Sequence, residues 1–238
     1  MLGTQAAERL PMPAPTPATS ATPARPVRRR AGRPTAAVLD QGGITTAALE
    51  LIGTKGYNGL TMAALARSLG VAPSALYNHV SSKDDVLILL MDHLAAMVDV
   101  SAFGTEPWDS AVRRWAWSYR DVFSEHTPLI PIIAVLPVAN APKTLAMYES
   151  VTAGFREAGF PEDRIISAIV ALEAFVFGAA YDVTAPDDIF DAGSLASQVP
   201  NFTAAVDRLA LENHPRPTDV AFSLGLEALI SGFGALRA

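Results

Sequence analysis

The stretch that decides the fold is GLTMAALARSLGVAPSALYNHVSSK, residues 59–83. Its pattern predicts two short helices joined by a tight turn. Thr61 suits the cap of the first helix, because its hydroxyl can accept a bond from a free amide of the first turn. Gly70 ends this helix, since glycine readily adopts the left-handed conformation. Pro73 suits the first position of the second helix, where no backbone donor is lost.

The two predicted helices share one apolar face and expose one polar face. The apolar face carries Leu65, Ala66, Leu69, Leu76 and Val80. The polar groups of the second helix belong to Ser74, Tyr77, Asn78 and His79. A short helix that exposes such donors and is clamped by another helix is suited to the major groove of DNA. The segment therefore predicts a DNA-binding helix-turn-helix.

Helices are also predicted on either side of this pair. Before it, apolar residues recur at helical spacing from Ile44 to Ile52, and the helix stops near Lys55-Gly56. After it, residues 84–100 form a longer amphipathic helix. Lys83 stands at its start, where a basic side chain beside free backbone amides is well placed for phosphate.

The charge is distributed unevenly along the chain. The 238 residues carry a net charge of −6, but residues 25–83 alone carry +6 and residues 84–238 carry −12. A basic head on an acidic body is typical of nucleic-acid-binding proteins. The alternative is an incidental basic tail beside a neutral domain, because solvated charge runs are common.

Residues 1–32 are rich in Pro, Ala and Thr, so we expect them to be disordered. This segment ends in a basic run of the kind that can enter a minor groove. The run contains Arg28, Arg29 and Arg30, and Arg33 follows it. A solvated linker is the alternative interpretation.

Residues 104–238 are predicted to be entirely helical, because no useful length shows the two-residue alternation of a strand. Four prolines between 128 and 142 break an apolar segment into short pieces. Such a broken segment is suited to lining a cavity rather than filling a core.

Two later helices, residues 164–182 and 219–236, are predicted to associate with their copies. The first is apolar on nearly every side and should be buried on all sides. The second repeats large apolar residues at heptad spacing, with Gly225 and Gly232 available for close approach. Together they predict a homodimer joined by a four-helix bundle. The alternative is that both are core helices of a monomer.

The composition limits the class of protein. The absence of cysteine excludes disulfides and thiolate chemistry. The best candidate for a membrane span, residues 165–181, has 17 residues and contains Glu173, whereas a span needs about 20 apolar residues. We therefore expect no membrane segment and no signal peptide, which agrees with a cytoplasmic protein.

The motif at residues 59–83, with Gly32-Arg33-Pro34 before it, resembles the DNA-binding head of the TetR family of bacterial transcriptional regulators. The resemblance covers about residues 32–95 and is weaker beyond residue 100. It implies an all-α fold with an N-terminal three-helix helix-turn-helix domain and a C-terminal helical domain for ligand binding and dimerisation. The expected divisions are an arm (1–32), the DNA-binding domain (33–82), a connecting helix (83–103) and the ligand-binding domain (104–238).

The resemblance also implies roles for single residues. Those expected at backbone phosphates are Thr61, Tyr77, His79 and Lys83. Those expected to face bases are Pro73, Ser74, Ala75 and Asn78. Only Ser74 and Asn78 of the second group can form side-chain hydrogen bonds with bases. Since Ala63 and Ala64 stand where the family often has an arginine, base readout is expected to depend also on the arginine arm or on DNA shape.

Aromatic and polar residues of the C-terminal part are candidates for a largely apolar effector pocket. They are Trp108, Trp115, Tyr119, Phe123, His126, Met147, Tyr148, Phe155, Glu173 and Phe177. Aromatic stripes at helical spacing are also typical of an ordinary core. His126 and Glu173 are the sharper candidates, because a polar group among apolar neighbours needs a partner.

The functional hypothesis is a homodimeric repressor that binds a palindromic operator and is released by a small, largely apolar effector. The alternative is an all-helical small-molecule binder or enzyme whose head is only an interaction module. No catalytic motif is present, and the four histidines show no metal-ligand spacing, so we expect no enzyme, cofactor or metal site.

Overall fold

The structure is a computed structural model that describes residues 39–186, 188–211 and 217–237. Within these ranges every regular element is a helix and no strand occurs, which confirms the all-α prediction. The α-helices are α1 (Gln41–Lys55), α2 (Met62–Ser68), α3 (Pro73–Tyr77), α4 (Lys83–Ala95), α5 (Trp108–Ser124), α6 (Ile130–Ile133), α7 (Pro142–Glu157), α8 (Glu162–Asp182), α9 (Pro200–Leu211) and α10 (Pro217–Gly234). Three short 3-10 helices are η1 (Tyr57–Gly59), η2 (Thr127–Leu129) and η3 (Gly193–Gln198).

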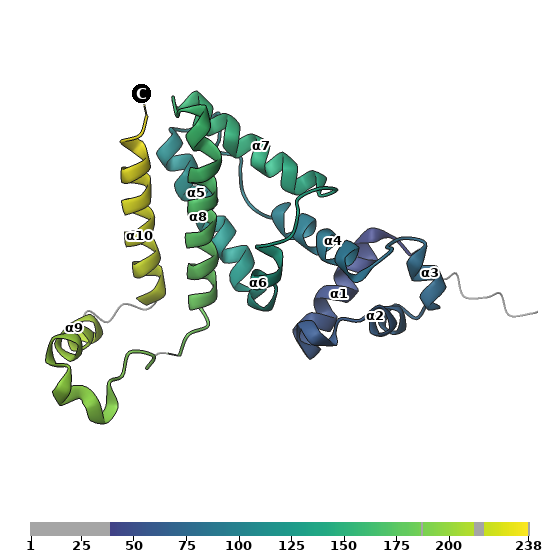
Figure 1. Cartoon of the computed structure of the whole chain (residues 1–238), viewed down its shortest axis with the longest axis horizontal. Coiled ribbons are helices and arrows are strands. Elements are labelled where there is room, and N and C mark those ends of the chain that lie inside the picture. The colour runs from purple at the N-terminus through teal and green to yellow at the C-terminus, as the bar shows by residue number, and fades with distance from the viewer. Residues whose placement is uncertain (1–38, 187, 212–216, 238) are drawn as a thin grey trace, which may run out of the picture. The chain divides into compact units, whose positions relative to one another are not determined.

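Helices α1, α2 and α3 form a small three-helix head (Figure 1). The predicted local signals are present: Thr61 Oγ1 accepts a hydrogen bond from Ala64 N, Gly70 has a φ of 66°, and Pro73 is at the first turn of α3. The side chains of Ile44 and Leu76 are completely buried and join α1 to α3 in one core.

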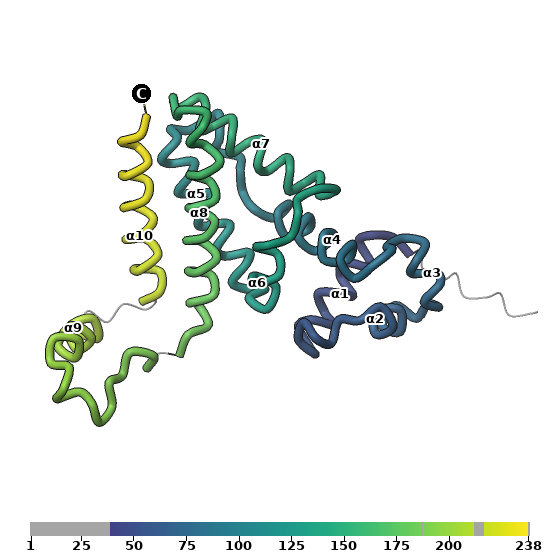
Figure 2. The backbone as a smooth tube through the Cα atoms, viewed as in Figure 1, coloured from purple at the N-terminus to yellow at the C-terminus, as the bar shows by residue number. Residues whose placement is uncertain are grey.

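Helix α4 connects this head to the larger helical body (Figures 1 and 2). It packs against α1 on the head and against α5, α6 and α7 on the body. Ser82 caps it, because its hydroxyl accepts a bond from Asp85 N. The helix ends at Ala95 rather than near Val100. Beyond this end the backbone turns and Asp99 N donates to Ser118 Oγ at 2.8 Å, which holds the chain against α5.

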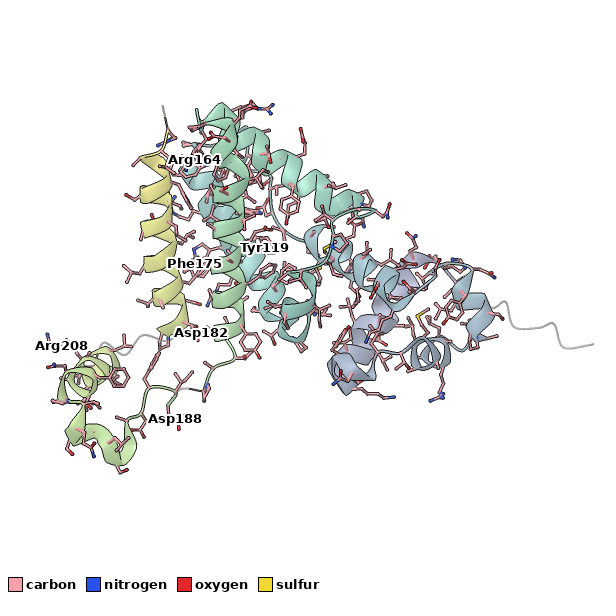
Figure 3. All side chains as sticks on the ribbon, viewed as in Figure 1. Tyr119, Arg164, Phe175, Asp182, Asp188 and Arg208 are labelled. Atoms are coloured by element: carbon pink, nitrogen blue, oxygen red, sulfur yellow. The ribbon has the colours of Figure 1, made fainter. Side chains whose placement is uncertain are left out.

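The body has an aromatic core between α5, α7, α8 and α10. The rings of Trp108 and Phe155 meet edge to face at 5.1 Å, and those of Phe175 and Phe222 stack at 5.3 Å. Phe175 therefore lies between α8 and α10 (Figure 3). A Cβ added at Gly225 would meet its ring, so this glycine allows α10 to approach α8 within one chain.

A buried arginine also joins α5 to α10. The side chain of Arg120 is 3% exposed, and its Nη1 lies 2.7 Å from Asp219 Oδ1. The guanidinium also lies 5.1 Å and 4.9 Å from the rings of Trp117 and Phe222. A buried charge of this kind is tolerated only when it is paired, so this contact helps to fix the position of α10.

The expected bounds of the two association helices are shifted, because α8 begins at Glu162 and α10 runs from Pro217 to Gly234. Within one chain, the first of these helices is not buried on all sides. Ile165, Ile169 and Leu172 are buried, whereas Ile166 and Val170 on another face are 62% and 56% exposed. This chain covers only part of the apolar surface of α8.

Helix α8 is longer than the predicted 17-residue apolar segment. With 21 residues and a mean hydropathy of 1.7 it is long and apolar enough to cross a membrane. A core helix of a helical bundle meets the same criteria, and α8 packs against α5, α7 and α10. We therefore interpret it as a bundle helix.

The segment between α8 and α10 packs differently. Helix α9 packs chiefly on η3, and neither element contains a buried residue. The described residues belong to one compact unit, so the expected divisions at residues 82 and 103 stay predictions.

Candidate functional site

The outer face of α3 carries the polar side chains expected of a recognition helix. Ser74 is exposed on α3, and Tyr77 is 50% exposed although it is aromatic. Asn78 and His79 are exposed too, but they lie in the turn after α3 and not in the helix as predicted, because α3 ends at Tyr77. Leu76 is on the opposite side and completely buried, as a helical period of 3.6 residues requires. Of the positions expected to face bases, Ala75 is half-buried and Pro73 is exposed.

Thr61 lies exposed at the start of α2. Its Oγ1 accepts the hydrogen bond from Ala64 N at 3.1 Å. A hydroxyl that accepts one bond still has its own proton to donate. The cap therefore leaves Thr61 able to donate to an anion at the surface.

Lys83 has a partner within the chain. Its Nζ lies 3.7 Å above the ring of Tyr57 and donates to the Tyr57 carbonyl oxygen at 3.4 Å. This contact ties the start of α4 to η1. The expected phosphate contact of Lys83 stays a prediction, and Tyr57 is a residue that the sequence did not single out.

The charge of residues 51–83 favours an anion. No acidic residue occurs between Leu51 and Lys83, a stretch that contains Lys55 and Arg67. Both basic side chains are exposed. Arg28, Arg29, Arg30 and Arg33 lie outside the described residues, so the role of the arm stays a prediction.

The body contains a cavity of about 70 Å³. Helices α4, α5, α6, α7 and α8 all contribute to its walls. The lining residues are Met91, Ala95, Tyr119, Phe123, Ile133, Ala134, Leu136, Val138, Thr144, Tyr148, Glu173 and Phe177. The proline-broken segment, which supplies Ile133 and Leu136, thus lines a cavity as predicted.

Glu173 is the acidic group of this cavity. Its Oε1 accepts hydrogen bonds from the hydroxyls of Tyr148 at 2.7 Å and Tyr119 at 3.0 Å. Burial raises the pKa of the Glu173 carboxyl, against the opposing effect of these two bonds. Burial, followed by the nearby Glu173 charge, also raises the pKa of both tyrosines, so their hydroxyls remain protonated donors.

Three aromatic rings pack together beside this carboxyl. The ring centroids of Tyr119 and Phe123 are 5.0 Å apart, and Phe177 lies 5.4 Å from the first and 5.1 Å from the second. Figure 3 shows Tyr119 on α5 beside α8. The cavity therefore combines apolar walls with one acidic group, which is a common composition of small-molecule sites.

Comparison with known proteins identifies the chain's family. Residues 44–90 match the model for bacterial regulatory proteins of the tetR family, and residues 102–237 match the tetracyclin repressor-like C-terminal domain. The second match alone covers more than half of the chain. The chain belongs to the TetR family.

Three relatives illustrate this membership. An HTH-type transcriptional regulator of Saccharopolyspora erythraea is 31% identical over 65% of this chain, which spans 64% of that relative, less than two thirds of its length. The class D tetracycline repressor protein of Escherichia coli is 30% identical over 82% of this chain and 89% of its own. The crystal structure of apo ActR from Streptomyces coelicolor has a TM-score of 0.71 and 26% identity over 84% of this chain and 97% of its own.

These matches confirm the predicted family, whose N-terminal model describes bacterial regulatory proteins. TetR-family proteins are transcriptional regulators as a class, which favours the regulator over the alternative enzyme. Among the described residues, no group of three His, Asp or Glu side chains is placed to hold a metal ion.

Five of the ten candidate effector residues line the cavity of this TetR-family protein: Tyr119, Phe123, Tyr148, Glu173 and Phe177. The other five do not. Trp115, Met147 and Phe155 are core residues, and Trp108 lines a separate cavity of about 140 Å³ beside Phe103. His126 is at the start of η2, where partial burial lowers the pKa of its imidazole.

Asp92 on α4 is an important residue that sequence reasoning missed. This residue is only 8% exposed, and its Oδ1 accepts hydrogen bonds from Lys143 N at 2.7 Å and Thr144 N at 2.9 Å. It thus caps α7, whose own N-cap residue Ala141 has no suitable side chain. Because Thr144 lines the cavity, this cap ties one cavity wall to α4.

Proposed function

We propose that this TetR-family protein is a homodimeric transcriptional repressor, which binds a palindromic operator and is released when an effector occupies the cavity of the body. The observation that carries the proposal is the position of α4. Met91 and Ala95 of this helix line the cavity, and the same helix packs on α1 of the head.

The proposed operator contacts follow from the exposed face of the head. Tyr77, His79 and Thr61 have exposed donors suited to backbone phosphates. Ser74 and Asn78 have the exposed groups suited to base edges, and an asparagine pairs well with adenine. This small base-reading set leaves a share of the specificity to the arginine arm and to DNA shape.

The proposed dimer uses the exposed apolar faces of α8 and α10. Ile166 and Val170 on α8 and Leu224 on α10 are 62%, 56% and 74% exposed. Large exposed apolar side chains on two neighbouring helices are suited to an interface. A twofold axis through α8 and α10 would form a four-helix bundle and present two α3 helices about 34–36 Å apart, one turn of DNA.

The small size of the cavity supports release by an effector. At about 70 Å³ it is smaller than an engineered cavity of about 150 Å³ that holds benzene. An effector larger than this must displace a wall, and α4 forms part of the wall. Displacement of α4 would change the spacing of the two α3 helices, provided that the effector binds one arrangement more tightly than the other.

The names of the relatives support this assignment. The Saccharopolyspora protein is a transcriptional regulator and the class D protein a tetracycline repressor. ActR of Streptomyces coelicolor has been solved in complex with actinorhodin, with a TM-score of 0.67 and 26% identity to this chain. A regulator of this kind acts on DNA in the cytoplasm, and we assign this protein to the same place.

The DNA-binding part of the proposal is tested by mobility shift on the DNA upstream of the protein's own gene. We expect a specific shift that weakens steeply as the salt concentration rises. Tyr77→Ala and His79→Ala should each weaken operator binding about tenfold, because each removes a phosphate donor. His93→Ala, which changes an exposed histidine of α4, is the matched control and should bind as the wild type does. Absence of a specific shift at every salt concentration would contradict the proposal.

A further inference from the structure

The cavity contains one carboxylate and no basic group. Of its twelve lining residues, Glu173 is the one with a carboxyl group, and no lysine, arginine or histidine is among them. No ion pair is formed by Glu173 with any of the described residues. A carboxylate away from water and without a cation is unfavourable.

The two tyrosines only partly compensate this charge. Each phenol has a single O–H to donate, and both donate to the same oxygen, Oε1. The other oxygen, Oε2, accepts no hydrogen bond from the described residues. One carboxylate oxygen at the cavity therefore remains available to a ligand.

The neighbouring rings favour the same kind of ligand. Tyr119, Phe123 and Phe177 line the cavity and pack with centroids 5.0 to 5.4 Å apart. The negative face of an aromatic ring attracts a cation within about 6 Å. The carbon atoms of an organic ammonium can also pack against the apolar walls of the cavity. A carboxylate beside such rings is therefore complementary to an organic cation.

We propose that the effector carries a positively charged nitrogen, as a protonated amine or quaternary ammonium on a compact apolar body, and that Glu173 is its counter-charge. This inference rests on the proposed role of the cavity as the effector site. A divalent metal ion fits less well, because calcium and magnesium require about six oxygen ligands, and no group of three acidic or histidine side chains gathers in the described chain.

Three probes of nearly equal shape separate the effect of charge. Benzylammonium, benzyl alcohol and benzoate share one small ring and carry a positive, a neutral and a negative group at neutral pH. Calorimetry with the wild-type protein and no DNA should show benzylammonium binding at least about tenfold more tightly than benzyl alcohol, and benzoate most weakly. Absence of benzylammonium binding, equal affinities, or tightest binding of benzoate would overturn the inference.

The role of Glu173 is tested by Glu173→Gln, which keeps an acceptor for the tyrosine hydroxyls but removes the charge. We expect the preference for benzylammonium over benzyl alcohol to disappear. Glu149→Gln is the matched control, since this exposed glutamate is next to Tyr148 in the sequence and outside the cavity lining. It should retain the full preference. A preference that survives Glu173→Gln would also overturn the inference.

A second variant keeps the test valid if Glu173→Gln fails to fold. Tyr148→Phe removes one donor from Oε1 and leaves the charge, so the preference for the cation should persist or increase. Its loss would overturn the inference. These assays contain no DNA. A cation preference without any effect on operator binding would therefore refute the proposed release but support the cation site. Release from the operator by uncharged ligands alone would support the proposed release but refute the cation site.

Discussion

Two carboxylates of the body use the same chemical group in different ways. Asp92 Oδ1 accepts hydrogen bonds from two backbone amides and from the Thr144 hydroxyl. Glu173 Oε1 accepts hydrogen bonds from two tyrosine hydroxyls, and this carboxyl lines the cavity. The first carboxylate stabilises a helix start, whereas the second faces a space that a ligand can enter.

Asp92→Ala should destabilise the fold and weaken the link between α4 and the cavity wall. It would leave the amides of Lys143 and Thr144 without their acceptor, with a loss of about 1–3 kcal/mol of unfolding free energy. Urea denaturation measures this loss. Asp84→Ala, at an exposed position of the same helix, should cost only about 0.3–1 kcal/mol. Equal losses would contradict a capping role for Asp92.

Glu173 should make stability depend on pH. Burial raises the pKa of its carboxyl above the model-compound value of 4.5, so the folded state holds this proton at pH values where the unfolded chain releases it. The unfolding free energy contributed by Glu173 therefore falls as the pH rises from 4.5 through the folded pKa. Urea denaturation of wild type and Glu173→Gln over this range should show the wild type losing stability relative to the variant. A constant difference would refute the raised pKa.

For single residues, the sequence predicted the exposure of side chains whose position depends on the local helical period. The exposure of Ser74 and Tyr77 follows from the helical period and from the buried position of Leu76, whereas Asn78 and His79 are exposed in the turn after α3. The cap by Asp92 joins residues 51 and 52 positions apart, and the contact of Lys83 with Tyr57 joins residues 26 apart. Such contacts depend on tertiary packing, which a local pattern does not contain.

Among the elements, the helices near the head were easier to predict than those of the body. Thr61, Gly70 and Pro73 give strong start and stop signals, and these signals operate in the structure. Helix α4 ends before the predicted residue, at Ala95. Apolar spacing alone also did not reveal which face of α8 is covered, because its partner α10 is distant in sequence.

The exposed face of α8 and α10 should hold the dimer together. Leu224→Asp places a charge on a side chain that is 74% exposed in one chain, so folding should be preserved. Sedimentation should show monomers at concentrations where the wild type is dimeric, because a buried unpaired charge costs several kcal/mol in an interface. Operator affinity should also fall when the dimer is lost.

The matched control for this variant is Val135→Asp. This valine is 81% exposed and follows α6, outside the two helices that form the proposed dimer face. It should leave the dimer intact. A dimer that survives Leu224→Asp would contradict the assignment of this face.

For the whole molecule, α4 connects the proposed recognition surface and the proposed effector cavity. It packs on α1 of the head, lines the cavity with Met91 and Ala95, and caps α7 through Asp92. A ligand larger than the cavity would therefore displace the helix that also contacts the head. The sequence predicted the two functions and their order along the chain, but it did not show this shared helix as the link.

The most direct test of the proposed release is the operator affinity of the wild-type protein at fixed salt concentration, measured without ligand and with a ligand that calorimetry shows to saturate the cavity. We expect at least about tenfold weaker operator binding at saturation, equivalent to about 1.4 kcal/mol of coupling. An operator affinity that is unchanged at saturation would contradict it.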